Sequence, residues 1–196
     1  MGVSPLATPI RFWETSRLVA MPSPSISVDD TEARRHVTAP EPETEEPAPD
    51  IDLSDLPAYS GKDYVALNNN IPWFTASEKV TESYETYSDL DALGRCTQVM
   101  ACCGRDLMPT EDRGDIGSIK PTGWVQKQYD GNLVSGGNLY NRCHLIGWQL
   151  TAENANEKNL ITGTRYMNTE GMLPFEDMVA DYIRETGNHV LYRVTP

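Results

Sequence analysis

Apolar side chains recur with a helical period in one long segment of the chain, residues 174–186. The apolar positions that share one helical face there are Phe175, Met178, Val179, Tyr182 and Ile183. Pro174 suits the first turn of a helix, and Gly187 follows as a stop signal. The pattern therefore predicts an amphipathic helix over 174–186 with one face buried.

Short apolar runs between turn residues predict β-strands elsewhere. Residues 95–104 form one such run, and residues 189–196 form another. Residues 57–74 predict two short strands around an Asn-rich turn. Residues 83–92 are polar and acidic, but their few apolar positions have helix-like spacing, so we expect a helix there.

A β-hairpin is predicted in the second half of the chain. Residues 125–129 have the period of a strand, 130–138 have the composition of a turn, and 139–150 predict the second arm. The polar segments 105–124 and 151–159 predict loops. Strands and helices in this mixed order predict an α+β domain with an antiparallel sheet and flanking helices.

The first part of the chain differs in composition from the rest. Residues 21–50 are rich in Pro, Ser, Thr and Glu and hold almost no large apolar residue, so they bury too little surface to offset the entropy of ordering. We expect 1–56 to be a disordered acidic arm or linker and 57–196 to be the folded domain. Charged residues interrupt the apolar groups of 1–20, so neither a standard signal peptide nor a membrane span is predicted.

The net charge argues against one class of protein. The chain carries −13, of which −5 lies in residues 1–50 and −8 in residues 51–196. A general nucleic-acid binder that works through a basic surface needs positive charge to neutralise phosphates. The folded part is acidic, so we expect any nucleic-acid contact to be confined to a locally basic cleft.

The four cysteines leave two interpretations open. Their spacing lacks the paired C-x₂-C units or accompanying histidines of a zinc site. A disulfide from Cys96 to Cys102 or Cys103 would suit an exported protein. The alternative, which we favour, is that the cysteines are small buried hydrophobic residues.

Two residues in the hairpin suggest phosphodiester chemistry. Arg142 and His144 lie two positions apart, so on a strand both side chains project from the same face. Phosphodiester hydrolysis needs a base for water and a cation for the non-bridging oxygens. On these two residues alone, a hydrogen-bonded histidine beside a surface arginine is the simpler interpretation.

Residues downstream of His144 favour the catalytic interpretation over the structural one. Asn159 is followed by Asn168 nine positions later and by Glu176 eight positions after that. With Arg142 and His144, this spacing resembles the DNA/RNA non-specific endonucleases of the ββα-metal class, and most closely their bacterial secreted and DNA-entry branch. Taken singly, each residue could be a cap, a loop residue or a first-turn acid, but five residues at the family spacing are much more specific.

The resemblance implies a role for each residue. His144 would be the general base, Arg142 a phosphate contact and Asn159 a residue that positions the site. Asn168 would be the direct protein ligand of Mg²⁺, with Mn²⁺ as an alternative, and Glu176 would hold metal-bound water. A hard cation that dehydrates reluctantly suits a site with few protein ligands.

Two residues depart from the family motif, Asp-Arg-Gly-His. The Asp is Asn141 here, and the Gly is Cys143. Neither change removes the base, the arginine or the metal ligand, so we expect activity to persist. Cys143 should point away from His144, which disfavours a rival reading in which Cys143 is a nucleophile.

The resemblance implies a metal-dependent endonuclease that hydrolyses DNA and RNA without strong sequence specificity. The alternative is a catalytically impaired, nuclease-like module that binds nucleic acid or a protein. We expect a secreted or cell-surface bacterial protein, with no membrane partner, that serves in scavenging, DNA uptake or as a toxin with an inhibitor or immunity protein. The chain ends at Pro196 in or just after a strand, where the resembled domain continues, so we expect a truncated domain.

Overall fold

The computed structural model describes residues 56–196, which belong to two compact units. The described part of the smaller unit comprises residues 56–59 and 65–78, and the larger unit comprises 60–64 and 79–196. The predicted arm over 1–56 lies almost wholly outside the described residues. The division at residue 56 therefore stays a prediction.

The smaller unit contains one short 3-10 helix, η2 (Asn68–Asn70), within its described residues. All three asparagines have positive φ, between 47° and 62°. The two strands predicted for 57–74 are wrong, because none of these described residues is in a strand. The Asn-rich turn lies where it was predicted, since asparagine adopts a left-handed conformation more readily than most residues, but the described residues on either side of it form no β-ladder.

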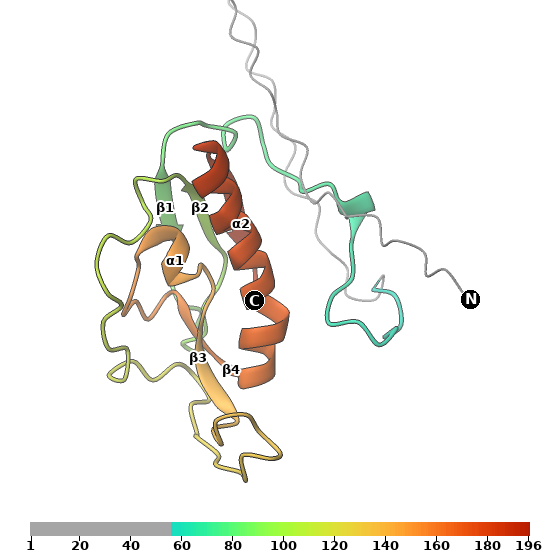
Figure 1. Ribbon diagram of the computed structural model, residues 1–196. Helices are drawn as coiled ribbons and strands as arrows, with labels where there is room; N and C mark the ends of the chain where they lie inside the picture. The colour runs from blue at the N-terminus through green and yellow to red at the C-terminus, as the bar shows by residue number, and fades with distance from the viewer. Residues whose placement is uncertain (1–55) are drawn as a thin grey trace, which may run out of the picture. The chain divides into compact units, whose positions relative to one another are not determined.

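The larger unit contains a three-stranded antiparallel sheet in the order β1-β2-β5, of which β1 and β2 are labelled in Figure 1. Its strands are β1 (Tyr84–Tyr87), β2 (Val99–Cys103) and β5 (Val190–Val194). Every residue of the central strand β2 is buried. The strands predicted within 95–104 and 189–196 are confirmed.

The helix predicted for 83–92 is wrong, because strand β1 occupies the start of that segment. Tyr84 pairs with Cys102 and Tyr87 with Val99, so β1 completes one edge of the buried β2 ladder. Tyr87 also packs against the core cluster. Pairing with a buried strand outweighs the weak helical spacing, and tyrosine and threonine suit a half-buried strand.

A second, two-stranded sheet leads into the long helix. Strands β3 (Tyr140–His144) and β4 (Leu160–Thr164) are antiparallel, and His144 is opposite Leu160. The chain continues through a π-helical segment, η3 (Met167–Met172), into α2 (Leu173–Thr186). The predicted α+β class is confirmed, and strand, strand and helix follow one another as β3, β4 and α2.

The predicted helix over 174–186 is confirmed in type and nearly in extent. Pro174 lies in its first turn, and Gly187 ends it in a left-handed conformation with φ of 72°. The Gly187 amide donates a hydrogen bond to the Ile183 carbonyl. This is the usual way in which glycine terminates a helix.

The predicted hairpin is wrong in its pairing. Residues 125–129 contribute one isolated bridge, Gln128 to Asn138, whereas the ladder partner of β3 is β4. Strand β3 also ends at His144 rather than continuing to residue 150. The helical turn α1 (Trp148–Thr151) follows it, so Trp148 and Leu150 anchor a helix and not a strand.

The core lies where α2 and the segment after β3 cover one face of the three-stranded sheet. Alternate β2 residues face it, as expected for a strand that packs against a helix. The buried members of the cluster are Val99, Ala101, Cys103, Leu145, Ile146, Leu150, Val179, Ala180 and Ile183. All four cysteines have free thiols, and the interpretation as small buried hydrophobic residues is confirmed for Cys102, Cys103 and Cys143, whereas Cys96 is only half-buried.

The segment Ser60–Tyr64 also belongs to the larger unit. The Tyr166 hydroxyl donates a 2.8 Å hydrogen bond to an Asp63 carboxylate oxygen. The Tyr64 ring meets the Phe175 ring edge to face, with 5.1 Å between centroids. These contacts connect the segment to the residue before η3 and to the first turn of α2. Within residues 56–196, no helix has the length and apolar character needed to span a bilayer.

Gly163, in the middle of β4, provides the first testable prediction. A Cβ atom there would lie 2.6 Å from Cys143 Sγ and would also collide with Met167 Cε. Gly163→Ala should therefore lower the free energy of unfolding by about 1–3 kcal/mol, the usual effect of overpacking. Urea denaturation followed by circular dichroism measures this loss.

Gly131→Ala is the matched control, because a Cβ at Gly131 meets no atom within 4 Å. The double variant Gly163→Ala with Cys143→Gly should recover part of the lost stability. Equal stability of the Gly163→Ala and Gly131→Ala proteins would show that the contact does not limit packing.

Candidate active site

Alternation along β3 brings three side chains to one cleft of about 590 Å³. Tyr140, Arg142 and His144 line it, whereas the buried Cys143 projects to the other face toward Gly163. The prediction that Arg142 and His144 project from the same face of a strand is therefore confirmed. The cleft also receives side chains from the loop before β3, from α1, from η3 and from the start of α2.

The His144 ring is held at one nitrogen and directed into the cleft at the other. Its Nε2 lies 2.8 Å from the Asn154 carbonyl oxygen, which can only accept a hydrogen bond. Nε2 therefore carries the proton, and the lone pair of the neutral ring is on Nδ1. Arg113 Nη2 lies 3.3 Å from Nδ1.

The protonation state of His144 favours a base. The residue is only 6% exposed, and this burial lowers the pKa of His144 from its ordinary value, because a charged imidazolium loses its hydration. The hydrogen bond to Asn154 opposes the shift, and the nearby Arg113 adds to it. At neutral pH the imidazole is uncharged and Nδ1 can accept a proton.

Arg142 uses its guanidinium largely to hold a loop. Its Nε donates to the Ile119 carbonyl at 2.5 Å, and its Nη2 donates to the Gly117 carbonyl at 3.0 Å. The guanidinium carbon also lies 4.0 Å from the centroid of the Trp124 ring. A cation in this position is attracted to the aromatic face. Arg142 therefore fixes the loop that forms one wall of the cleft.

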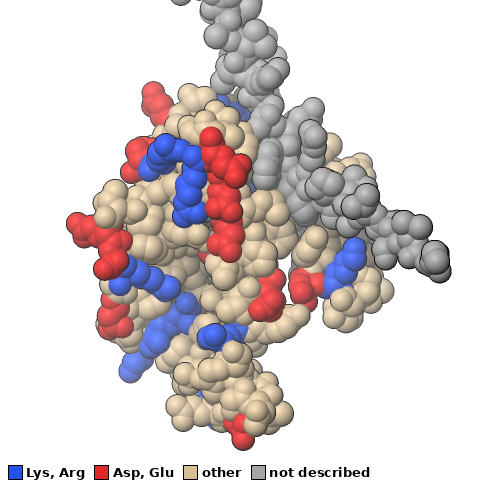
Figure 2. Space-filling view, viewed as in Figure 1, with Lys and Arg blue, Asp and Glu red and all other residues tan. Residues whose placement is uncertain are grey.

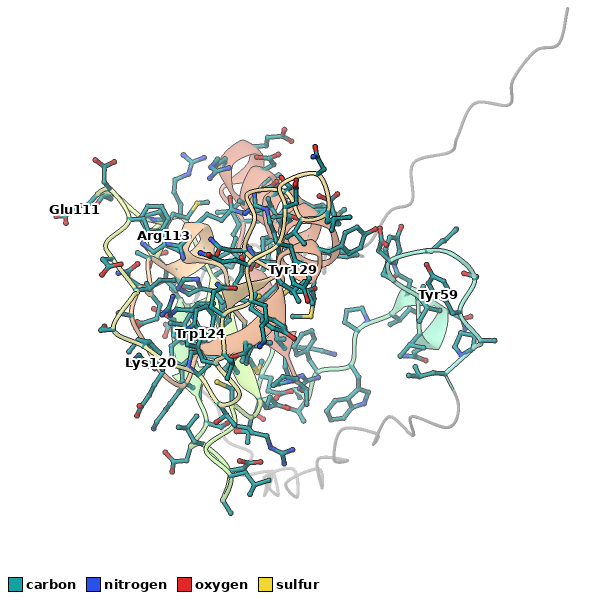
Figure 3. All side chains as sticks on the ribbon, turned by 90° about the horizontal axis from the view of Figure 1, so that it is seen from below. Tyr59, Glu111, Arg113, Lys120, Trp124 and Tyr129 are labelled. Carbon is teal, nitrogen blue, oxygen red and sulfur yellow. The ribbon has the colours of Figure 1, made fainter. Side chains whose placement is uncertain are left out.

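Arg113 is the cleft residue that the sequence analysis missed. It lies in the loop between β2 and β3, as Trp124 does, and both are on the same side of the larger unit (Figure 3). Its side chain is exposed, and among the described residues its one hydrogen-bonding partner is His144. No periodic pattern marks a loop residue, so the sequence held no signal for it except its charge.

Asn159 lies beneath the site and does not line the cleft. Its side chain is 0% exposed. Its Oδ1 accepts a 2.9 Å hydrogen bond from the Ile146 amide, and its Nδ2 donates to the Ile146 carbonyl at 3.0 Å. Its own carbonyl accepts from the Leu145 amide. Asn159 thus holds the two residues that follow His144.

Asn168 and Glu176 face the same cleft from η3 and α2. Within residues 56–196, no protein group forms a hydrogen bond with the Asn168 carboxamide. Burial raises the pKa of Glu176 to about 7, and a hydrogen bond from Gln149 opposes that shift. Gln149 also donates a 2.8 Å hydrogen bond to Asp177, which ties α1 to the first turn of α2.

Gly147 provides the space that Glu176 occupies. A Cβ atom at residue 147 would collide with the Glu176 carboxylate. The φ of Gly147 is −58°, which any residue can adopt, so the constraint is steric and not conformational. The glycine lets the carboxylate approach the backbone at the end of the cleft nearest α1.

The chemistry of these donors suits a hard divalent cation. Asn168 offers a neutral carboxamide oxygen, and Glu176 offers a carboxylate whose pKa of about 7 allows it to ionise near neutral pH. No group of three or more His, Cys, Asp or Glu side chains in the described part of the chain could hold a metal ion. Any cation in this cleft would therefore keep much of its water, as Mg²⁺ commonly does.

Cys143 does not resemble a nucleophile. It is 0% exposed, and burial raises the pKa of its thiol to about 11. The thiolate is the reactive form, and an apolar environment suppresses it. The structure agrees with the expectation that Cys143 points away from His144.

Charge is unevenly distributed over the larger unit. Figure 2 shows Lys and Arg side chains gathered in the lower left of the view, with acidic side chains around and above them. Arg113 and Arg142 both line the cleft, although residues 51–196 carry −8 overall. Glu176 and Asp177 line the same cleft, so the two arginines there face two acidic residues, and the expected locally basic cleft is not what the lining shows.

The comparison with protein families bears on this arrangement directly. The family model for DNA/RNA non-specific endonuclease matches residues 75–196. The chain belongs to the DNA/RNA non-specific endonuclease family. The match includes β3, β4, η3 and α2, so all five residues predicted for the endonuclease site lie within it.

Solved structures support the fold of this domain. NucA from Streptococcus agalactiae with a magnesium ion bound is 23% identical, covers 61% of this chain and gives a TM-score of 0.52. NucA with no metal bound gives 22% identity, 61% coverage and a TM-score of 0.51. The chain spans 58% of NucA in both cases. The predicted ββα-metal nuclease fold is confirmed.

Two other comparisons add nothing to the fold assignment. The Sda1 nuclease with a bound zinc ion is 23% identical over 58% of this chain and 62% of its own length, at a TM-score of 0.47. The search of curated proteins found no match.

The buried carboxylate of Glu176 leads to a prediction about stability and pH. Since its pKa is raised to about 7, the folded state binds a proton that the unfolded chain releases near pH 4.5. Stability therefore falls as pH rises from about 4.5 to about 7, and a shift of this size corresponds to ~3 kcal/mol. Glu176→Gln should remove most of this loss.

The measurement is urea unfolding at pH 4.5 and pH 8 in the presence of a chelator. Glu176→Gln should be more stable than the original protein at pH 8 and similar to it at pH 4.5. Glu185→Gln, at an exposed position on the same helix, is the control. A stability gain that is equal at both pH values would contradict a buried, titrating carboxylate.

Proposed function

We propose that the domain is a metal-dependent endonuclease that hydrolyses phosphodiester bonds in DNA and RNA without strong sequence preference. The observation that carries the proposal is the geometry of His144. Its Nε2 donates to a backbone carbonyl, and its Nδ1 faces a cleft lined by Asn168, Glu176 and two arginines. This arrangement supplies a neutral base, oxygen donors for a cation and positive charge for a phosphate.

In the proposed reaction, His144 Nδ1 takes a proton from the attacking water. The hydrogen bond from Nε2 to Asn154 keeps the ring in the required tautomer and stabilises the imidazolium that forms. Asn159 keeps the backbone beyond His144 in place, so the ring has little freedom to turn away. Asn159 is accordingly a positioning residue.

Asn168 would hold the cation directly, and Glu176 would orient the water around it. A bound Mg²⁺ or Mn²⁺ would supply Lewis-acid stabilisation of the charge that develops on the phosphate oxygens. The unpartnered carboxamide of Asn168 and the carboxylate of Glu176 are oxygen donors, as hard cations prefer. Gly147 leaves the carboxylate room to adopt this position.

The two arginines differ in their hydrogen-bonding partners, so we assign them different roles. Arg142 uses two donor nitrogens on the loop, whereas Arg113 is exposed and directs a guanidinium nitrogen at His144. A phosphate is a charged acceptor and therefore a stronger partner than a neutral imidazole. We infer that Arg113 turns to the bound phosphate and leaves Nδ1 to the water, while Arg142 chiefly maintains the cleft.

Export from a bacterial cell and an inhibitor protein stay predictions of the family resemblance. The direct test of the proposal is digestion of plasmid DNA and of RNA with Mg²⁺ and with excess chelator. Cleavage of both substrates that stops in chelator is the expected result. Intact substrates in Mg²⁺ and in Mn²⁺ would favour the alternative of a module that binds without cutting.

A titration of cleavage rate against Mg²⁺ separates the proposed base from the metal ligand. His144→Ala should abolish cleavage at every Mg²⁺ concentration, because added cation does not replace a proton acceptor; imidazole in the buffer should restore part of the rate. Asn168→Ala should weaken metal binding, so its defect should shrink as Mg²⁺ is raised. Rescue of His144→Ala but not Asn168→Ala by high Mg²⁺ would mean that the roles are reversed.

Variants of the two arginines should differ in which property they lose. Arg113→Ala should lower kcat by about 100-fold, typical for loss of one donor to a transition-state oxyanion, and leave the melting temperature unchanged. Arg142→Ala should lower the free energy of unfolding by about 2–3 kcal/mol, because the loop loses two hydrogen bonds and a cation–π contact.

Steady-state cleavage assays and thermal melts distinguish these outcomes. Lys120→Ala, which removes an exposed charge from the same loop, is the matched control and should change neither property strongly. If Arg142→Ala left the protein stable and lowered kcat more than Arg113→Ala does, Arg142 and not Arg113 would be the phosphate contact.

A further inference from the structure

The cleft continues past the proposed catalytic residues toward the start of β3. Tyr140, Arg142 and His144 occupy alternate positions on one strand, so successive side chains lie about 7 Å apart along the cleft. Trp124 lies beside this row, with the Arg142 guanidinium 4.0 Å from its ring centroid. This end of the cleft therefore combines two aromatic rings with an arginine.

The backbone that bears Tyr140 is fixed by a side chain from the neighbouring segment of the chain, which runs alongside the start of β3. Gln126 Nε2 donates to the Tyr140 carbonyl at 2.8 Å, and Gln126 Oε1 accepts from the Tyr140 amide at 3.2 Å. The Tyr140 hydroxyl, in contrast, makes no hydrogen bond to any residue in the described part of the chain. The ring is thus held at its base and open at its tip.

We propose that this end of the cleft is a nucleobase subsite, in which the Tyr140 ring stacks on the base next to the scissile phosphate, beside the Arg142–Trp124 pair. The inference rests on the proposed function and identifies the favoured form of its substrate. In a duplex, neighbouring bases cover both faces of each base. The subsite therefore selects a strand that is single or locally unpaired.

Stacking is compatible with cleavage that ignores sequence. Every base has an aromatic face, so a ring that binds by stacking accepts all of them. The Gln126 side chain donates to the Tyr140 carbonyl and accepts from the Tyr140 and Lys127 amides. It therefore has little hydrogen-bonding capacity left for the edges of a base. Asn138 also lines the cleft, but a single amide does not define a sequence.

The charge of the protein makes such a subsite useful. Residues 51–196 carry −8, so long-range attraction for a polyanion is weak outside the cleft. Contacts with bases add affinity that does not depend on counterion release. The subsite would supply the part of substrate binding that a basic surface supplies in other nucleases.

The test compares two single strands of equal length in Mg²⁺. One is oligothymidylate, and the other is the same phosphate backbone with a tetrahydrofuran in place of every nucleoside, so that it lacks bases. The original protein should cleave oligothymidylate with a kcat/KM about tenfold higher than the baseless strand. It should also cleave oligothymidylate faster than the same strand paired with oligoadenylate.

Variants at Tyr140 connect this preference to the ring. Tyr140→Leu should lower kcat/KM for oligothymidylate to near the value for the baseless strand and hardly change the latter. Tyr140→Phe keeps the ring and should keep the preference. Tyr129→Leu, at an exposed tyrosine outside the cleft, is the matched control and should behave as the original protein (Figure 3).

Two results would overturn the proposal. One is equal cleavage of both strands by the original protein, and the other is a Tyr140→Leu defect that is equal on both strands. If no strand is cut, the proposed function fails, and fluorescence anisotropy of the two labelled strands in chelator then decides on the subsite alone. Equal binding of both strands would reject it, and tighter binding of oligothymidylate that Tyr140→Leu removes would support it.

Discussion

The site depends on one buried amide, the carboxamide of Asn159. Its hydrogen bonds to both backbone groups of Ile146 end the β3 strand and turn the chain into α1. The turn places His144 at the strand end and brings Gly147 under Glu176. Without these bonds, two buried backbone groups would lose their hydrogen-bonding partners. The position of His144 relative to Glu176 on α2 would then no longer be fixed.

Burial of the charged groups is the second constraint on this cleft. It lowers the pKa of His144 and raises that of Glu176 to about 7, so at neutral pH the imidazole is uncharged and the carboxyl group is partly protonated. Both groups avoid part of the free-energy cost of a buried charge. In the proposed reaction, a proton on Glu176 and a cation near Asn168 would compete, because the cation favours the ionised carboxylate.

The sequence predicted the elements whose patterns are long or strongly apolar. Strand β2, strand β5 and helix α2 follow from hydrophobic runs, a helical period and a glycine stop. Period two along the strand predicted that Arg142 and His144 share a face. Of the five residues at the family spacing, four line the cleft, and the fifth, Asn159, is buried beneath it.

Other features were not predictable because they arise from contacts distant in sequence. Strand β4 is short and contains Gly163, so nothing marked it as the partner of β3. Strand β1 owes its conformation to the buried β2 ladder and not to its own weak pattern. Arg113 reaches His144 from a loop 31 residues earlier, and no local pattern indicates that proximity. The Arg142 contacts with Gly117 and Ile119 were hidden for the same reason.

Cys143 and Gly163 fill a single space between β3 and the start of η3. A Cβ at residue 163 would come within 2.6 Å of the Cys143 sulfur. The side chain that replaces the glycine of the family motif at 143 is therefore accommodated by the absence of one at 163. The two positions share one packing volume, so side-chain volume cannot increase on both strands at once. An engineered chain with alanine at 163 would therefore pack best with glycine at 143, so the two positions have to be designed as a pair.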